Sequence, residues 1–368
     1  MSAEVCRWGI MGTSGIARKN WHAILNAENA TLVAVASRDV AKADAYIDEN
    51  QTQYAFQERP RAIGSYEALL TADDIDAVYI PLPTGARTEW VIRAAQAGKH
   101  VLGEKPAGVS ASEVEEILST CQANQVHYMD GVMFMHSARL SKMKEVLADG
   151  ESVGEIRRIA SHFSFGAPEE FRQTNIRVHS ELEPAGCLGD LGWYTIRISQ
   201  WAMDWQMPKQ VVGRIITDQQ HPHGKTTVPI EFAGELIYEN GVSAGFYCSF
   251  ITHHQQWTHI SGSKGWLHLS DFVIPNYAAT AEFTVANDDL VINGCQFDME
   301  RHATQYSVRE YSNNAASAHE TNMFRNFSDT IRSGRADQDW GAIALQTQRI
   351  VDALMQSAAE GQAIIDIS

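Results

Sequence analysis

The sequence predicts an α/β protein built from two domains, and three observations support this fold class. Through the first third of the 368 residues, short apolar segments alternate with segments of helical period. This alternation is typical of βαβ units and of a parallel sheet. Beyond about residue 150, longer strand-like segments follow one another, which indicates a large, mostly antiparallel open sheet. The chain is also longer than one compact domain usually needs.

The first domain is expected to hold five strands separated by helices. The strands are predicted over residues 6–11, 31–37, 75–83, 99–106 and 126–135. The helices are predicted over residues 15–27, 40–50, 87–98 and 110–125. Ser110 stands where a serine cap would begin the last of these helices. The strands are apolar along their length, which fits burial on both faces of a parallel sheet.

The second domain is expected to contain long strands followed by helices. Strands are predicted over residues 154–166, 210–218, 232–250 and 257–271, and helices over residues 322–334 and 342–361. Asn240-Gly241 and Lys264-Gly265 stand where two hairpin turns belong. We therefore predict a first domain over residues 1–130 and an α+β domain over residues 131–368. Helices within residues 320–360 are candidates to pack back on the first domain.

The composition narrows the classes of partner. The formal net charge is -16, which argues against nucleic acid and anionic membrane surfaces as partners. No apolar run approaches the roughly 20 residues of a membrane span, and the N-terminal residues lack the pattern of a signal peptide. The five cysteines are scattered, and no zinc motif is formed by His221, His223, His253, His254 and His259. We therefore expect a cytoplasmic protein with free thiols and no bound metal.

A glycine-containing loop joins the first strand to the first helix. In such a loop, backbone N–H groups meet a pyrophosphate at the N-terminus of the helix. The dinucleotide fingerprint G-x-G-x-x-G/A is incomplete here, because Ser14 stands where the second glycine is expected. A tight turn without a ligand is the alternative. The residues predicted to bind the cofactor are Gly12, Thr13, Ser14, Gly15, Ile16 and Ala17.

The end of the second strand favours NADP over NAD. An NAD site usually places Asp or Glu there to accept from the ribose 2′-hydroxyl, whereas this chain has Ser37 and Arg38. A hydroxyl and a guanidinium suit a 2′-phosphate. Lys42, in the next helix, is a further candidate to bind this phosphate. The alternative for Lys42 is a solvated surface residue. Asp39 would weaken the preference if it pointed inward, so NAD stays possible.

Two further segments carry candidate chemistry. Glu104-Lys105-Pro106 follows a strand of the first domain, and open α/β sheets bind ligands at the C-terminal edge of their strands. Residues 186–194, GCLGDLGWY, place Asp190 and Tyr194 one helical turn apart among three glycines. The glycines would let a helix N-terminus and a substrate approach closely.

These segments resemble the glucose-fructose oxidoreductase / inositol dehydrogenase / rhizopine catabolism (GFO/IDH/MocA) family of oxidoreductases. The resemblance covers nearly the whole chain, including the first-strand loop, Ser37-Arg38 and residues 79–106, 186–194 and 344–361. It implies a Rossmann domain that binds NAD(P), followed by a domain for substrate binding and oligomerisation. It also implies cofactor contacts from Pro81, Leu82, Pro83, Thr84, Glu104 and Lys105. The chain departs from the family at Ser14 and at Arg87, where a histidine is usual.

The same resemblance implies a pair of catalytic residues. Family members pair the lysine of the Glu-Lys-Pro segment with a residue four positions after the aspartate, often a histidine. Tyr194 stands there, as in the branch that includes dimeric dihydrodiol dehydrogenase and NADP-dependent xylose dehydrogenase. We predict that Lys105 and Tyr194 relay the proton, in an order left open, and that Asp190 orients Lys105 or binds a substrate hydroxyl. The alternative for Tyr194 is a hydrogen-bonded tyrosine of the core, and the alternative for Asp190 is an aspartate that caps a helix.

Four more residues are candidates to line the substrate site: Trp193, Arg177, His136 and Arg139. Trp193 could equally be a core residue, and Arg177 could belong to an interface.

The predicted function is hydride transfer between NADP(H) and a sugar, polyol or related alcohol or carbonyl compound. Oxidation of trans-dihydrodiols is an alternative within the enzyme class. A rival from another class is a non-catalytic NADP-binding regulatory or sensor protein, against which the intact Lys105 and Tyr194 argue. The expected partners are a small-molecule substrate and further copies of the chain, in a homodimer or homotetramer formed through the C-terminal sheet.

Overall fold

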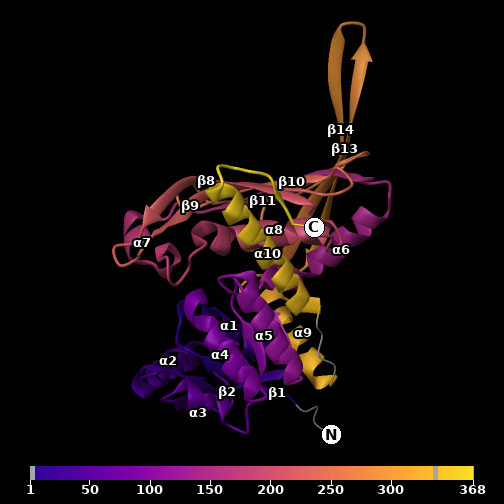
Figure 1. The fold of residues 1–368 in the computed structure, drawn as a ribbon. Helices are drawn as coiled ribbons and strands as arrows, with labels where there is room; N and C mark the ends of the chain where they lie inside the picture. Colours follow the sequence, from indigo (N-terminus) through magenta and orange to yellow (C-terminus); the bar gives the residue numbers. More distant parts are fainter. Residues whose placement is uncertain (1–4, 335–338, 368) are drawn as a thin grey trace. The chain divides into compact units, whose positions relative to one another are not determined.

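A computed structural model of the protein describes residues 5–334 and 339–367 (Figure 1). The chain divides into two compact units. The first unit comprises the residues up to His136, together with Glu181–Pro184 and Asn313–Arg349. The second unit comprises Ser137–Ser180, Ala185–Ser312 and the residues from Ile350 onward.

The first unit is built on a parallel six-stranded sheet with the order β3-β2-β1-β4-β5-β6, which confirms the α/β prediction. The strands are β1 (Cys6–Met11), β2 (Ala30–Ala36), β3 (Arg61–Ile63), β4 (Ala77–Ile80), β5 (His100–Gly103) and β6 (Tyr128–Asp130). The helices are α1 (Gly15–Asn26), α2 (Val40–Gln53), α3 (Tyr66–Leu70), α4 (Thr84–Gln96), α5 (Ala111–Ala123) and α9 (His319–Arg332). The strand order reverses between β1 and β4, so the C-terminal ends of these strands form the edge at which such sheets bind ligands.

The strand predicted over residues 126–135 is wrong in its second half. β6 ends at Asp130, and Met133–His136 forms a 3-10 turn instead. The amide of Val132 donates to the carbonyl of Asp130, which folds the backbone back and ends the extended ladder. The sequence also did not predict β3 and α3, because both are too short to show a periodic pattern.

Helix α9 completes the core of the first unit, although it is far from β1 in the sequence. Trp8 of β1 is fully buried, and its ring centroid lies 5.0 Å from that of Phe324 and 4.9 Å from that of Phe327. Its indole N–H donates to the hydroxyl of Ser328 at 3.2 Å. Burial of these aromatic rings is what holds α9 on the sheet.

Replacing Phe324 with alanine should therefore lower the free energy of unfolding by about 3–5 kcal/mol, because a cavity would remain against Trp8. Urea denaturation monitored by tryptophan fluorescence measures this loss. Ser333→Ala, at an exposed position just after the same helix, should change the free energy by less than about 0.5 kcal/mol. Equal losses in the two variants would contradict the assignment of α9 to the core.

The second unit is built on a nine-stranded, mostly antiparallel sheet, as predicted, with the order β14-β13-β12-β11-β7-β10-β9-β8-β15. The strands are β7 (Ile156–Ser164), β8 (Gln210–Gln220), β9 (Thr227–Ile237), β10 (Ser243–Ser249), β11 (Gln255–Gly262), β12 (Trp266–Leu269), β13 (Thr280–Asn293), β14 (Gln296–Arg309) and β15 (Ile365–Asp366). Its helices are α6 (Ala138–Ala148), α7 (Glu169–Thr174) and α8 (Trp193–Ala202). Helix α10 (Asp339–Ala359) contributes residues to both units.

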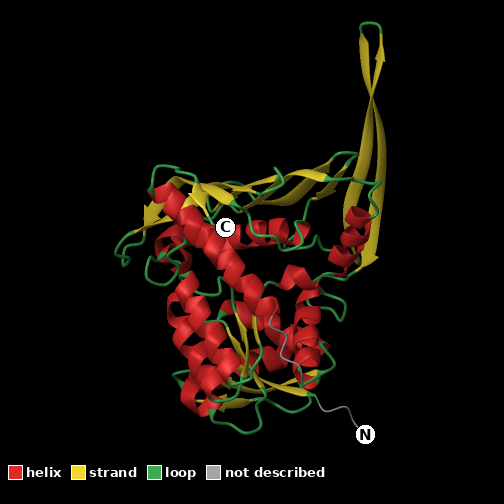
Figure 2. Ribbon diagram, turned by 45° about the vertical axis from the view of Figure 1, so that its right-hand side comes forward, coloured by secondary structure: helices red, strands yellow, loops and turns green. Residues whose placement is uncertain are grey.

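Both predicted hairpin turns are confirmed. Asn240-Gly241 connects β9 to β10, with a φ of 82° at Gly241, and Lys264-Gly265 connects β11 to β12. The long β13–β14 hairpin was not predicted, although Asn293-Gly294 is a turn signal between alternating segments. Figure 2 shows this hairpin extending beyond the other strands of its sheet.

Helix α8 covers one face of this sheet by packing against β7 and β10. All ten of its residues are buried. The side chains of the sheet that point toward α8, such as Phe163, are buried as well. The second unit therefore has its hydrophobic core on one side of the sheet.

Candidate functional site

The loop between β1 and α1 has the features of a phosphate-binding loop. Gly12 has a φ of 106°, a conformation that favours glycine, and its amide donates to the carbonyl of Ala36 at 2.8 Å. The buried hydroxyl of Ser14, at the N-cap of α1, has no hydrogen-bond partner among the residues that the structure describes. A Cβ atom added at Gly15 would have no atom within 4 Å. An unpartnered hydroxyl beside an open helix N-terminus fits the pyrophosphate of a dinucleotide.

The burial of the other residues of this loop is also consistent with phosphate binding. Ala17 is fully buried, as expected where the helix packs closely on the sheet. Thr13 is half-buried and Ile16 is exposed. The loop therefore presents backbone and small polar groups rather than a packed surface.

Ser37 and Arg38 follow β2 directly, at the same edge of the sheet. Ser37 is buried and Arg38 is exposed. Burial raises the pKa of the Tyr66 phenol, whose oxygen lies near Gly12, and the positive charge of Arg38 opposes that rise. Arg38 therefore contributes positive charge to the surroundings of Tyr66. Lys42 is exposed in the first turn of α2.

Asp39 has a structural contact of its own. Its carboxylate accepts from the amide of Ala41 at 3.0 Å and caps the N-terminus of α2. An acidic cap also interacts favourably with the helix dipole. This contact accounts for the carboxylate without a role at a ribose hydroxyl.

The turn after β4, Pro81-Leu82-Pro83, leads into α4, whose N-terminus is capped by a residue that the sequence did not reveal. The carboxylate of Glu183 accepts from the amide of Thr84 at 3.0 Å and from its hydroxyl at 2.6 Å. The next amide, of Gly85, donates to the carbonyl of Leu182 at 2.9 Å. The segment Glu181–Pro184 thus fixes the start of α4. No local pattern indicates a contact between residues so far apart in the sequence.

Arg87 joins two loops at the C-terminal edge of the sheet. Its side chain is 1% exposed, its Nε donates to the carbonyl of Leu82 at 3.0 Å, and one terminal nitrogen donates to the hydroxyl of Thr84 at 3.0 Å. The other terminal nitrogen donates to the carbonyls of Glu104 and Pro106. The two carbonyls of this Glu-Lys-Pro segment flank Lys105. The guanidinium therefore ties the backbone around Lys105 to the turn after β4.

Glu104 holds the same segment from its other side. One carboxylate oxygen accepts from the Tyr79 hydroxyl at 2.5 Å, and the other accepts from the amide of Lys105 at 3.3 Å. Tyr79 is fully buried, and burial raises its pKa well above the ordinary value, so it remains a donor. Lys105, which is half-buried, stands on a backbone held by two neighbouring side chains.

Asp190 lies within an irregular turn in the second unit, and Tyr194 lies in the helix that follows this turn. Residues Leu188–Gly192 form a single π-helical turn that continues directly into α8, and such turns recur at functional sites. The carboxylate of Asp190 pairs with the Nε of Arg177 at 2.8 Å. Tyr194 is 7% exposed, and its ring makes an edge contact with that of Phe163 at 5.6 Å.

The glycines of residues 186–194 have a packing role. Gly186 has a φ of 49°, and a Cβ atom there would lie 2.2 Å from the carbonyl oxygen of Pro229 in β9. A Cβ atom at Gly192 would lie 2.7 Å from the side chain of Leu188. At these two positions, glycine lets the π turn approach the sheet and pack on itself.

Three of the predicted substrate residues are buried. Trp193 is fully buried beneath the guanidinium of Arg197, which favours the core alternative. Arg139 is 1% exposed and pairs with Asp271 at 2.5 Å. The ring of buried His136 lies 4.8 Å from that of Trp340. Their assignment to substrate binding stays a prediction, as does that of Arg177.

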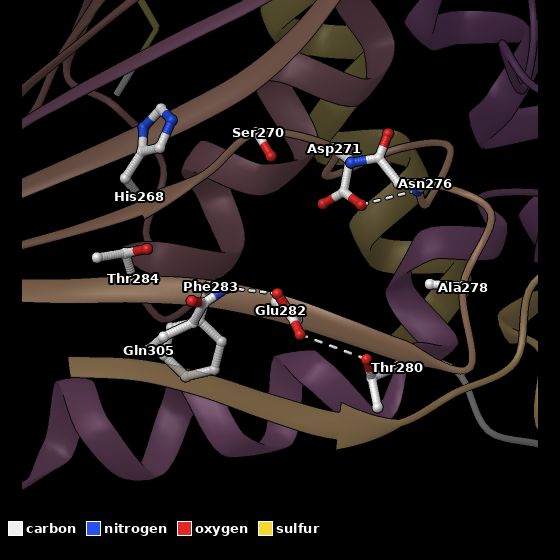
Figure 3. A pocket seen from close by; sticks show the side chains of 10 residues that line it. All are labelled: His268, Ser270, Asp271, Asn276, Ala278, Thr280, Glu282, Phe283, Thr284 and Gln305. Atoms are coloured by element: carbon white, nitrogen blue, oxygen red, sulfur yellow. Dashed lines mark hydrogen bonds between the residues drawn. The ribbon is translucent and has the colours of Figure 1, made fainter.

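A polar cavity of about 200 Å³ lies in the second unit, at the base of the β13–β14 hairpin (Figure 3). It is lined by His268, Ser270, Asp271, Asn276, Ala278, Thr280, Glu282, Phe283, Thr284 and Gln305. The carboxylate of Asp271 accepts from the amide of Asn276 at 2.8 Å, and that of Glu282 accepts from Gln305. Of the residues predicted for the site, none lines this cavity.

No group of three or more His, Cys, Asp or Glu side chains in residues 5–334 and 339–367 is arranged to hold a metal ion. Within those ranges, no helix is long and apolar enough to cross a membrane. Four cysteines are buried free thiols, and Cys295 is an exposed one.

Comparison with known proteins settles the family. Residues 6–132 match the GFO/IDH/MocA oxidoreductase family with an NAD-binding Rossmann fold, and residues 140–268 match the GFO/IDH/MocA C-terminal domain. The protein belongs to the GFO/IDH/MocA family. The predicted membership is confirmed, and the protein is accordingly an NAD(P)-dependent oxidoreductase.

Several GFO/IDH/MocA proteins match along much of the chain. D-xylose 1-dehydrogenase (NADP(+)) 2 of Haloferax volcanii is 30% identical over 97% of this chain and 98% of its own. Trans-1,2-dihydrobenzene-1,2-diol dehydrogenase of Mus musculus is 27% identical over 78% of each chain. A crystal structure of a 3-ketoreductase from Actinomadura kijaniata with NADP and TDP-benzene has a TM-score of 0.78, covering 96% of this chain and 98% of its own at 24% identity. This last likeness confirms the fold.

Proposed function

We propose that the protein transfers a hydride between NADP(H) and a hydroxyl or carbonyl carbon of a sugar or polyol, with Lys105 and Tyr194 as the acid/base pair. The observation that carries the proposal is the clamped Glu-Lys-Pro segment, which holds Lys105 at the ligand-binding edge of a Rossmann sheet. The full-length similarity to an NADP-dependent xylose dehydrogenase supports the substrate class.

The first unit would bind the cofactor through groups that suit its phosphates. The amides at the start of α1 and the unpartnered hydroxyl of Ser14 would hold the pyrophosphate. Ser37 and Arg38 would hold the 2′-phosphate of NADP. NADP supplies the hydride chemistry when it is bound, and the protein has to position it and move a proton.

The proton has to be handled by side chains of the protein. In the oxidative direction, the alcohol carbon loses a hydride and its hydroxyl loses a proton, while in the reductive direction the carbonyl oxygen gains one. A positioned acid/base contributes roughly 10²–10⁴-fold to such a step. Lys105 belongs to the first unit and Tyr194 to the second. Asp190, paired with Arg177, would orient a substrate hydroxyl.

The direct test is NADPH formation by the purified protein with a panel of aldoses, inositols and trans-dihydrodiols, run with NADP and with NAD. Turnover of an aldose or inositol supports the proposal. Turnover of dihydrodiols alone would favour the alternative suggested by the similarity to the mouse dihydrodiol dehydrogenase. Tight binding of NADP without turnover of any compound would favour the sensor.

The proposed preference for NADP predicts how a substitution of Arg38 changes the KM for each cofactor. Arg38→Ala should raise the KM for NADP by roughly tenfold or more and leave the KM for NAD unchanged, because only NADP carries the 2′-phosphate. Initial rates with each cofactor measure the two constants. Arg59→Ala removes another exposed arginine, paired with Asp44 and Asp48, and should change neither constant. A parallel loss with NAD would contradict the assignment of Arg38 to the phosphate.

A further inference from the structure

The carboxylate of Glu104 is held at the ligand-binding edge of the first sheet by two uncharged donors. The hydroxyl of Tyr79 donates to one of its oxygens at 2.5 Å, and the amide of Lys105 donates to the other at 3.3 Å. The side chain is half-buried, and it makes no ion pair with any residue in 5–334 or 339–367. A partly buried carboxylate of this kind gains stability from a positive charge placed nearby.

Tyr79 fixes the position of this carboxylate from within the sheet. Its ring is fully buried, and the centroid lies 5.8 Å from that of Phe324 in an edge contact. Burial raises the pKa of the Tyr79 phenol well above its ordinary value, the charge of Glu104 adds to the rise, and a hydrogen bond with buried Asn20 opposes it. The phenol therefore stays protonated and donates to Glu104.

The loop after β6 limits the space on another side of the carboxylate. A Cβ atom added at Gly131 would lie 3.3 Å from one oxygen of Glu104 and 3.3 Å from the carbonyl oxygen of Gly103. The amide of Gly131 donates to that carbonyl at 2.7 Å. The carboxylate therefore lies among the C-terminal ends of β4, β5 and β6, with its position set by groups from all three.

These strand ends belong to the half of the sheet that would receive the nicotinamide. In a sheet of this order, the two halves of a dinucleotide lie on opposite sides of the reversal between β1 and β4. The glycine loop follows β1, and Ser37 and Arg38 follow β2, where the adenosine half with its 2′-phosphate would bind. The ends of β4, β5 and β6, where Glu104 lies, are left for the nicotinamide half.

The charge of a nicotinamide cofactor changes at that half. Its ring is cationic when oxidised and neutral when reduced. Two positive groups of the protein are close to the same segment, since Lys105 is the next residue and the guanidinium of Arg87 donates to the carbonyls of Glu104 and Pro106. These positive charges disfavour a cationic ring, and the carboxylate of Glu104 offsets them.

We propose that the carboxylate of Glu104, held in place by Tyr79, selectively stabilises the oxidised cofactor on the protein. Opposite charges attract across a partly buried site that salt screens poorly, whereas a neutral reduced ring gains little. Stabilising NADP⁺ relative to NADPH favours donation of hydride to a carbonyl compound over its removal from an alcohol. The inference rests on dinucleotide binding by the family, and not on Lys105 and Tyr194 as the acid/base pair.

Glu104→Gln tests the proposal, because it removes the charge and keeps an oxygen that can accept from Tyr79. Calorimetric titration without substrate should show a Kd for NADP⁺ that is raised about tenfold or more, and a Kd for NADPH that changes by less than about threefold. If the protein prefers NAD, then NAD⁺ and NADH give the same comparison. Equal losses for the two forms would overturn the proposal, because they would indicate contact with a group that both forms share, and so would no loss for either.

Glu113→Gln is the matched control. Glu113 is also half-buried, and its carboxylate likewise accepts from one hydroxyl, that of Thr88 at 2.7 Å, and from one amide, that of Val109 at 3.2 Å. It lies in α5 rather than at the end of a strand. This variant should change neither Kd.

Glu104→Asp separates the charge from the shape of the side chain. Coulomb attraction falls slowly with distance, whereas the hydrogen bond with Tyr79 needs the full length of the glutamate. The ratio of the two Kd values should therefore stay within about threefold of the wild-type ratio. A ratio that changes as much as in Glu104→Gln would count against the charge as the cause. Thermal unfolding of each variant shows that it is folded, and the rise in Tm on adding each form of the cofactor gives a second comparison.

Discussion

Lys105→Met should reduce turnover by about 10²–10⁴-fold, and the variant should still bind NADP. Methionine keeps the length and packing of the side chain but has no ammonium to give or accept a proton. The backbone around it should stay in place, because Arg87 and Glu104 hold that backbone through its carbonyl and amide groups. Steady-state kinetics give the loss of kcat, and calorimetric titration with NADP gives the affinity.

Lys209→Met is a matched control for this change, since Lys209 is an exposed lysine whose partner is the exposed Glu239. It should keep full activity. Tyr194→Phe should reduce kcat to a similar degree as Lys105→Met if the two residues form one relay, because groups that act as a unit are not additive. The variant that removes a limb of the pH profile of kcat identifies the group that titrates. Full activity of Lys105→Met would refute the proposed pair.

Arg87→Met should have the second largest effect, and it should act on both stability and catalysis. The variant leaves the carbonyls of Leu82, Glu104 and Pro106 without their buried donor, at about 1–3 kcal/mol for each unsatisfied group. A displacement of the Glu-Lys-Pro segment by about 1 Å would lower kcat by roughly 10²-fold. Urea denaturation and steady-state kinetics, at a temperature where the variant is folded, measure the two effects separately.

Arg93→Met is the matched control, because Arg93 lies on the same helix and its ion pairs, with Glu67 and Glu89, lie at the surface. Surface ion pairs of this kind contribute about 0–1 kcal/mol, so this variant should behave like the wild-type protein. Arg87→Lys should recover little, because lysine keeps the charge but lacks the planar fork of donors. Loss of stability with an unchanged kcat would show that Arg87 has only a structural role.

The sequence correctly predicted those features of the structure that depend on local patterns of residues. The alternation of strands and helices gave the parallel sheet, and Ser110 caps α5 through its hydroxyl, which accepts from the amide of Glu113. The hairpin turns at Asn240-Gly241 and Lys264-Gly265 are where the turn residues place them. These features depend on backbone preferences and on the period of apolar residues, which are local properties of a chain.

Contacts between distant residues were decided only by the tertiary structure. No residue near Thr84 in the sequence indicates that Glu183 is its partner. In the same way, the local sequence does not indicate that Arg139 pairs with Asp271 or that Arg177 pairs with Asp190. Arg87 was identified only as a departure from the family, and its role emerged once the loops after β4 and β5 lay side by side. The exposure of residues 288–305 in the β13–β14 hairpin likewise follows from where β12 stops pairing with β13. Polar side chains find partners wherever folding brings complementary groups together, and burial depends on the neighbours that the whole fold supplies.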